Sequence, residues 1–130
     1  MIKFVISALI VFYINLSMIN ICYSNETIDV NDIVTTFKKS MMHWNINYDN
    51  LEKNKSGAAC IPWKSLNKKY FKKEIFIALG YGFNLYDIKI AKKAALEGCN
   101  RMRKANKIEK ICNCEMILYN DEILVKINNE

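Results

Sequence analysis

Four cysteines, Cys60, Cys99, Cys112 and Cys114, constrain the fold of this 130-residue chain more than any other feature of its sequence. A fifth, Cys22, belongs to an apolar N-terminal segment. A domain this small has little stability of its own, and small exported domains commonly contain structural disulfides. The even number of cysteines that follows the N-terminal segment therefore predicts two disulfides.

Residues 1–24 have the order of a secretory signal peptide. Basic Lys3 comes first, an apolar run follows, and small and polar residues lead to a cleavage position after Ser24. We expect the mature chain to begin at Asn25 and to form a single domain over 25–130. This order predicts a periplasmic or secreted protein.

Two alternatives to cleavage stay open. The uncharged stretch 4–23 is long enough to span a bilayer as an uncleaved anchor, although its asparagines and serines argue against this. Lipidation of Cys22 is the weaker alternative, because the bulky Ile21 precedes it. If the segment is cleaved, the chain contacts the membrane only transiently, through its signal peptide.

The net charge of +6 indicates an anionic partner only weakly. Of the 19 basic residues, only Arg101 and Arg103 are arginines, and asparagine and isoleucine are abundant, as in proteins of AT-rich genomes. Proteins that read nucleic acids favour arginine for its bidentate geometry. We therefore expect no specific nucleic acid partner, an unknown envelope or extracellular partner, and at most a weak contact with a membrane surface.

Apolar residues recur every three or four positions in 28–44, which predicts an amphipathic helix with Asn31 or Asp32 as its N-cap. The asparagine-rich segment 45–65 has no such period and predicts a long loop that carries Cys60.

The second half of the chain contains the predicted sheet. Residues 74–82 predict a strand, and Asp87 predicts the N-cap of a helix that ends near Ala105. Two further strands, 114–119 and 122–127, are joined by a two-residue hairpin turn. The sequence thus predicts a small, disulfide-stapled α+β domain, with an antiparallel sheet of about three strands, a helix packed on one face and an N-terminal helix.

The predicted strand restricts how the cysteines can pair. Cys112 and Cys114 would point to the same face with Cα atoms about 6.6 Å apart, at the stretched end of disulfide geometry. A bond between Cys112 and Cys114 would strain the chain, so we expect each of them to bond to a different cysteine. Because Cys99 lies on the apolar face of its helix, we favour Cys99–Cys114 with Cys60–Cys112, although all three connectivities stay open.

Metal and redox chemistry are the less favoured functions for these cysteines. Zinc sites use C-x₂-C spacing and commonly histidine, whereas this chain has C-x-C and a single histidine, His43. A C-x-x-C redox pair is also absent from the sequence. We expect no metal and no cofactor.

The second half contains a strand end, an alanine-rich helix and a cysteine-led strand in a distinctive order. The residues that form this pattern are Tyr81, Gly82, Phe83, Asn84, Ala91, Ala94, Ala95, Leu96, Cys99, Cys114 and Asn120. The pattern resembles a small secreted bacterial domain, DUF4189, over 74–124, within a strand–helix–hairpin segment over 74–127 that follows the helix and loop of 25–73. The resemblance implies a Cys99–Cys114 bridge and an exported location, but no chemistry, because that family has no assigned activity. The chain departs from it by carrying Cys60 and Cys112.

No catalytic site is predicted. Ser40 and His43 could share a helix face, but no acid orients the histidine, and a surface histidine beside a packed Trp44 explains the pattern better.

The best candidate surface lies in 63–73, where aromatic residues alternate with lysines. It could rest on anionic lipid or stack on sugars or bases, but the favoured interpretation has the aromatics covering the core while the lysines face water. The candidate residues are Trp63, Lys68, Lys69, Tyr70, Lys72 and Lys73.

Together, these features predict an exported, non-enzymatic binding or accessory protein of the bacterial cell envelope. The alternative is a small secreted enzyme or enzyme inhibitor whose site the sequence does not reveal.

Overall fold

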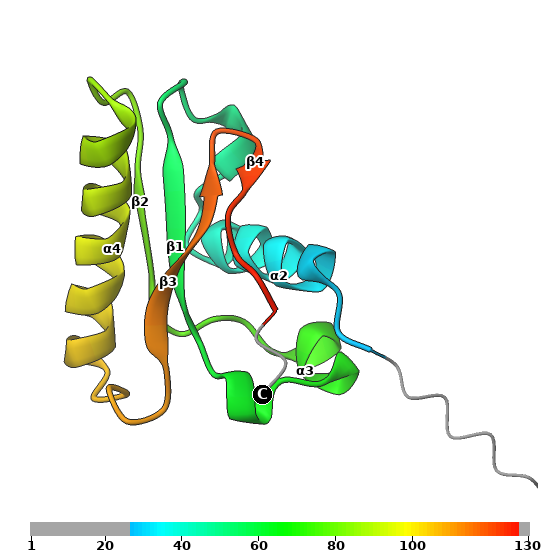
Figure 1. Cartoon of the computed structure of the whole chain (residues 1–130). Helices are drawn as coiled ribbons and strands as arrows, with labels where there is room; N and C mark the ends of the chain where they lie inside the picture. The colour runs from blue at the N-terminus through cyan, green and yellow to red at the C-terminus, as the bar shows by residue number, and fades with distance from the viewer. Residues whose placement is uncertain (1–26, 128–130) are drawn as a thin grey trace, which may run out of the picture.

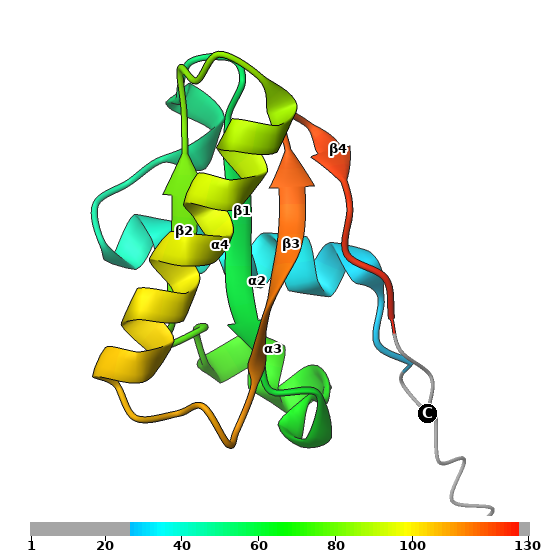
Figure 2. The ribbon, with the colours of Figure 1, turned by 60° about the vertical axis from the view of Figure 1, so that its left-hand side comes forward.

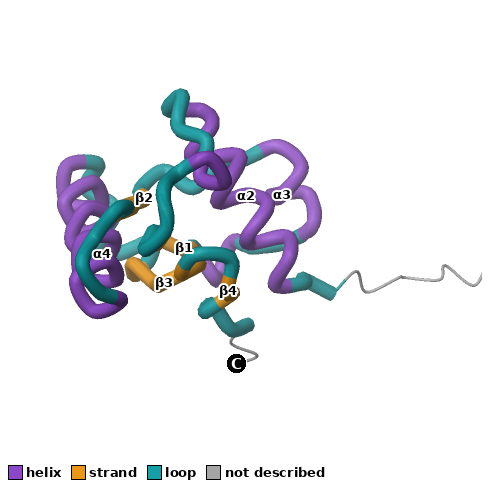
Figure 3. The backbone as a smooth tube through the Cα atoms, turned by 90° about the horizontal axis from the view of Figure 1, so that it is seen from above, coloured by secondary structure: helices purple, strands orange, loops and turns teal. Residues whose placement is uncertain are grey.

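A four-stranded antiparallel sheet lies between two helical layers in the computed structural model, which describes residues 27–127. The predicted signal peptide, 1–24, lies outside the described residues. Viewed from above, α4 covers one face of the sheet, while α2 and α3 lie on the other side (Figures 1 and 3). The strand order is β2-β1-β3-β4. The strands are β1 (Ser56–Ile61), β2 (Leu79–Gly82), β3 (Asn113–Tyr119) and β4 (Glu122–Ile123). The helices are α2 (Val30–His43), η1 (Tyr48–Asn50), η2 (Trp63–Ser65), α3 (Lys68–Lys73) and α4 (Ile88–Ala105).

The predicted α+β class is confirmed, but the prediction of a loop over 45–65 is wrong near its end. Ser56–Ile61 forms β1, an inner strand that pairs with both β2 and β3. Its residues are all buried and, apart from Ile61, small, so the sequence shows no polar–apolar alternation there. The sheet consequently has four strands rather than three, and β2 is shorter than the predicted 74–82.

Strand β1 separates two apolar clusters. Ala58 and Cys60 pack with α4, whereas Ala59 and Ile61 belong to the core beneath α2. This alternation follows from the two-residue repeat of a strand. Because the side chains of β1 are mostly small, both helices can approach the sheet closely.

Helix α4 is capped by Asp87, as predicted, with the Asp87 carboxylate accepting a hydrogen bond from the Ile90 amide at 2.9 Å. Ala91 and Ala95 are fully buried on its sheet side. Gly80 of β2 lies directly beneath α4, where a Cβ would collide with the α4 backbone. The small residues of α4 and β2 thus set the spacing between this helix and the sheet.

Helix α2 begins two or three residues earlier than predicted. Its N-cap is Asp29, not Asn31 or Asp32. Asp32 instead closes a capping box by accepting a hydrogen bond from the Asp29 amide at 2.9 Å. The predicted apolar stripe is buried as far as Met41, with Ile33, Phe37 and Met41 fully inaccessible, but its last member, Trp44, is exposed.

The hairpin turn between β3 and β4 is confirmed at Asn120, whose φ is 48°. Strand β4 contains only two residues, so the predicted strand 122–127 is too long. Within 27–127, no helix is both long and apolar enough to cross a membrane.

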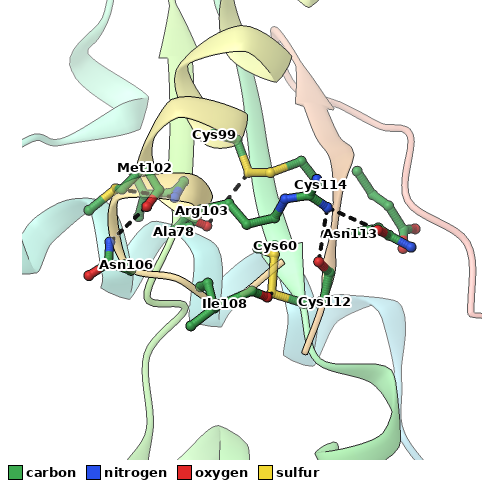
Figure 4. Close-up of a disulfide and its surroundings, with 12 residues drawn as sticks. Cys60, Ala78, Cys99, Met102, Arg103, Asn106, Ile108, Cys112, Asn113 and Cys114 are labelled. Carbon is green, nitrogen blue, oxygen red and sulfur yellow. Dashed lines mark hydrogen bonds between the residues drawn. A yellow bond between two sulfur atoms is a disulfide. The ribbon is translucent and has the colours of Figure 1, made fainter. Parts of the chain in front are cut away.

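Both favoured disulfides are present (Figure 4). Cys99 of α4 is bonded to Cys114 of β3, with 6.0 Å between their Cα atoms. Cys60 of β1 is bonded to Cys112, with 5.3 Å between Cα atoms. Disulfides of this kind persist in oxidising compartments, which indicates an extracytoplasmic environment.

The packing of α4 on β2 predicts a strong effect for Gly80→Ala. Overpacking typically lowers the free energy of unfolding by about 1–3 kcal/mol when side chains can shift. At Gly80 the obstacle is the backbone of α4, so we expect the free energy of unfolding to fall by an amount at or above the upper end of that range. Urea unfolding under oxidising conditions measures it. Gly82→Ala is the matched control, because the nearest atom to its added methyl is the terminal carbon of Leu85, at 3.0 Å. An unchanged midpoint for Gly80→Ala would contradict the described packing.

Candidate functional site

Two segments that are distant in the sequence meet at one end of the sheet. Residues 62–74, which include η2 and α3, leave the end of β1, and the 106–112 loop joins α4 to β3 (Figures 1 and 2). A cleft of about 360 Å³ is lined by Trp63 and Lys64 from the first segment and by Ile111 from the second, among others. The two segments therefore form one continuous surface.

This surface extends to the last residues of α4 and is strongly positive; we call residues 63–74 and 104–112 the basic end. Residues 63–74 and 104–112 together contain eight lysines and two acids. The loops at the opposite end of the sheet, 45–55, 83–90 and 119–122, contain three lysines and five acids. The charge is therefore concentrated at one end of the molecule. The exposed lysines of the basic end are Lys64, Lys69, Lys72, Lys73, Lys104, Lys107 and Lys110.

The aromatic residues of the predicted 63–73 surface are partly buried against the core. The Trp63 indole N–H donates to a Glu115 carboxylate oxygen at 2.5 Å, and the Tyr70 hydroxyl donates to the Ile75 carbonyl at 3.1 Å. Burial, with the nearby Glu74 charge, raises the pKa of the Tyr70 hydroxyl. Among the candidate residues, the lysines therefore form most of the outer surface.

A second cleft, of about 570 Å³, lies between α2 and α3. Within it, Lys68 forms an ion pair with Asp32 at 2.6 Å. Desolvation raises the pKa of Asp32, but the hydrogen bonds from Lys68 and the Asp29 amide lower it more, so the pKa lies below its ordinary value. Lys72 is exposed beside this pair, so the cleft extends the positive surface of α3.

Two exposed isoleucines lie at this basic surface, Ile111 in the 106–112 loop and Ile77 beside Tyr70. Ile77 is 54% exposed and Ile111 is 59% exposed, and both line a small apolar cavity of about 40 Å³. The Cys60–Cys112 disulfide and Ile108 form other walls of that cavity. The basic end thus combines positive charge with exposed aliphatic surface.

Hydrogen bonds hold the 106–112 loop in place. Arg103 donates from the same terminal nitrogen to the Cys112 carbonyl at 3.1 Å and to the Asn113 side chain at 2.9 Å (Figure 4). The Ile111 amide donates to the Ile108 carbonyl at 2.9 Å. Together with the disulfide, these contacts fix the position of Ile111 relative to the sheet.

The Ser40 and His43 side chains do not form a nucleophile–base pair. The buried Ser40 hydroxyl donates to the Thr36 carbonyl at 2.6 Å and accepts from the Phe76 amide at 2.9 Å. His43 is exposed, and its ring contacts Trp44 edge-on with 5.6 Å between centroids. Trp44 is itself 50% exposed, so the expectation of a packed tryptophan is wrong.

Residues 27–127 contain no group of three or more histidine, cysteine, aspartate or glutamate side chains that could hold a metal ion. No protein-family model matches the chain, and no curated protein or solved structure shows significant similarity to it.

The sequence alone predicts about half of the basic end. The lysines of 63–73 were recognisable from their alternation with aromatics, whereas Lys104, Lys107 and Lys110 carry no local signal that associates them with α3. Ile77 and Ile111 look like core residues in the sequence, and only the tertiary structure leaves them exposed.

The hydrogen bonds of Ser40 predict a structural role for this residue. Ser40→Ala leaves the buried Phe76 amide without an acceptor, so we expect a loss of about 1–3 kcal/mol in the free energy of unfolding. His43→Ala, at an exposed position, should change it by less than about 0.5 kcal/mol. Urea unfolding measures both. Unchanged stability of Ser40→Ala, accompanied by loss of a hydrolase activity in both variants, would contradict this assignment.

Proposed function

We propose that the protein is an exported, non-enzymatic binding or accessory protein of the bacterial cell envelope, and that its basic end binds an anionic component of that envelope. The observation that carries the proposal is the concentration of eight lysines, against two acids, in the two segments that meet there. Such a field attracts anions at long range and orients the approaching molecule.

The chemistry of the basic end favours a surface or polymer over a single small anion. Lysine ammonium groups are strongly hydrated point charges on flexible stems, and they bind distributed negative charge without the fixed geometry of an arginine fork. Lys68 is engaged with Asp32, while Lys69, Lys72 and Lys73 are exposed. Many weak contacts spread over a broad area fit this arrangement.

The resemblance to DUF4189 supports the exported, bacterial part of the proposal. The matching residues 81–84 lie at the end of β2 and just beyond it, and the matching alanines lie on α4, whose Cys99 is bonded to Cys114. The predicted secretory leader over 1–24 and the two disulfides support a periplasmic or secreted location.

A small secreted enzyme or enzyme inhibitor is the alternative function. The commitment of Ser40 to backbone hydrogen bonds supports a binding role over hydrolysis. An inhibitor would copurify with its target enzyme.

Charge neutralisation tests the binding surface. Changing Lys69, Lys73, Lys107 and Lys110 to Gln should weaken co-sedimentation with washed bacterial envelope fragments at least about tenfold, because each lysine near an anionic surface contributes about 1 kcal/mol. The binding should also weaken with added salt.

A control variant removes the same charge elsewhere. Changing Lys53, Lys89, Lys92 and Lys93, which lie before β1 and in the N-terminal half of α4, to Gln should leave most of the binding intact. Equal losses in the two variants would show that net charge alone drives binding and would refute a localised site, as would no binding by the unaltered protein.

A further inference from the structure

We infer that the basic end docks on the surface of a bilayer that contains anionic phospholipid, with Ile77 and Ile111 entering the headgroup region among the lysines. This inference rests on the proposed function and names the anionic component. It combines two independent observations: the charge of the basic end and the exposure of two aliphatic side chains at its surface.

The exposed isoleucines offer an apolar contact that charge alone does not supply. More than half of the surface of each residue faces water, at 54% for Ile77 and 59% for Ile111. Both line the same small apolar cavity, although they come from different segments. A clustered pair of exposed aliphatic residues with a polar rim is typical of a protein or membrane contact.

A bilayer fits this combination better than a hydrated polymer does. Transfer of aliphatic groups out of water is favourable, and membrane-surface proteins pair such groups with lysines that reach the anionic headgroups. Sugars and nucleic acid bases instead bind on flat aromatic faces. At the basic end, the rings of Trp63, Tyr70 and Phe71 are partly buried in the core, and the exposed apolar groups are branched and aliphatic.

The position of the two isoleucines in the fold suits shallow insertion. The 106–112 loop and α3 both lie at the same end of the sheet in the two side views (Figures 1 and 2). The Cys60–Cys112 disulfide forms a wall of the cavity that Ile77 and Ile111 line, which limits how far the loop can move. Docking would therefore need little rearrangement and would direct the acid-rich opposite end away from the anionic lipid.

The N-terminal turns of α4 provide a control region, because they also combine exposed isoleucines with lysines. Ile88 and Ile90 are 38% and 47% exposed and lie beside lysines. However, Asp87 caps this helix end, and Lys93 lies 3.8 Å from Glu97. The positive charge there is partly offset, so this region should bind anionic lipid weakly and serves as a matched control.

The experiment measures binding of the mature, oxidised protein to vesicles of phosphatidylcholine mixed with phosphatidylglycerol, and to vesicles of phosphatidylcholine alone. Trp44→Phe leaves Trp63, which lines a cleft with Ile111, as the only tryptophan. We expect its fluorescence to shift to the blue with the mixed vesicles and to stay unchanged with the neutral ones.

The variants separate insertion from charge. Ile77→Asn combined with Ile111→Asn should lower the partition coefficient for the mixed vesicles at least about tenfold, whereas Ile88→Asn combined with Ile90→Asn should change it less than about twofold. Circular dichroism and urea midpoints verify that both variants fold.

Three results would overturn the inference. Full vesicle binding by the folded Ile77/Ile111 variant would exclude insertion while leaving a charge-driven site intact. Binding of the unaltered protein to envelope fragments but not to the mixed vesicles would exclude lipid as the anionic component and leave the proposed function standing. Failure to bind either the vesicles or the fragments would refute both.

Discussion

The two disulfides are the constraint on which the rest of this structure depends. They join α4, β1 and the start of β3 at one end of the sheet, and close spans of 52 and 15 residues. In the chain-entropy model, such closures stabilise a fold by about 4 and 3 kcal/mol respectively. A strand made mostly of small residues, such as β1, contributes little apolar area on either face. The cross-links therefore supply a large part of the stability that the thin core does not.

The same cross-links also position the proposed binding surface. Cys60–Cys112 fixes the loop after α4 beside the segment after β1, which brings the lysines of both segments together and leaves Ile77 and Ile111 on a shared cavity. Without this link, the pairing of β1 with β3 and the hydrogen bonds of Arg103 would be left to hold the two halves of the basic end together. The Cys60–Cys112 disulfide thus contributes both to stability and to the proposed binding surface.

The sequence predicted the elements whose signals are local. Asp87 and the alanine-rich face indicated α4, Asn120 indicated the hairpin, and the two-residue repeat gave Cys112 and Cys114 separate partners. Strand β1 was not predicted, because its mostly small residues are buried on both faces and follow an asparagine-rich loop. The basic end was only half predicted, since the exposure of Ile77 and Ile111 depends on which surfaces the tertiary fold leaves uncovered.

The most direct test of the account is disulfide mapping of the native, unreduced protein. Only Asn113 separates Cys112 from Cys114, so fragmentation in the mass spectrometer must break the backbone at that residue. The account predicts that the fragment containing Cys112 carries the Cys60 peptide, that the fragment containing Cys114 carries the Cys99 peptide, and that none of the four thiols is free. Free thiols at these positions, or a link between Cys60 and Cys114, would contradict it.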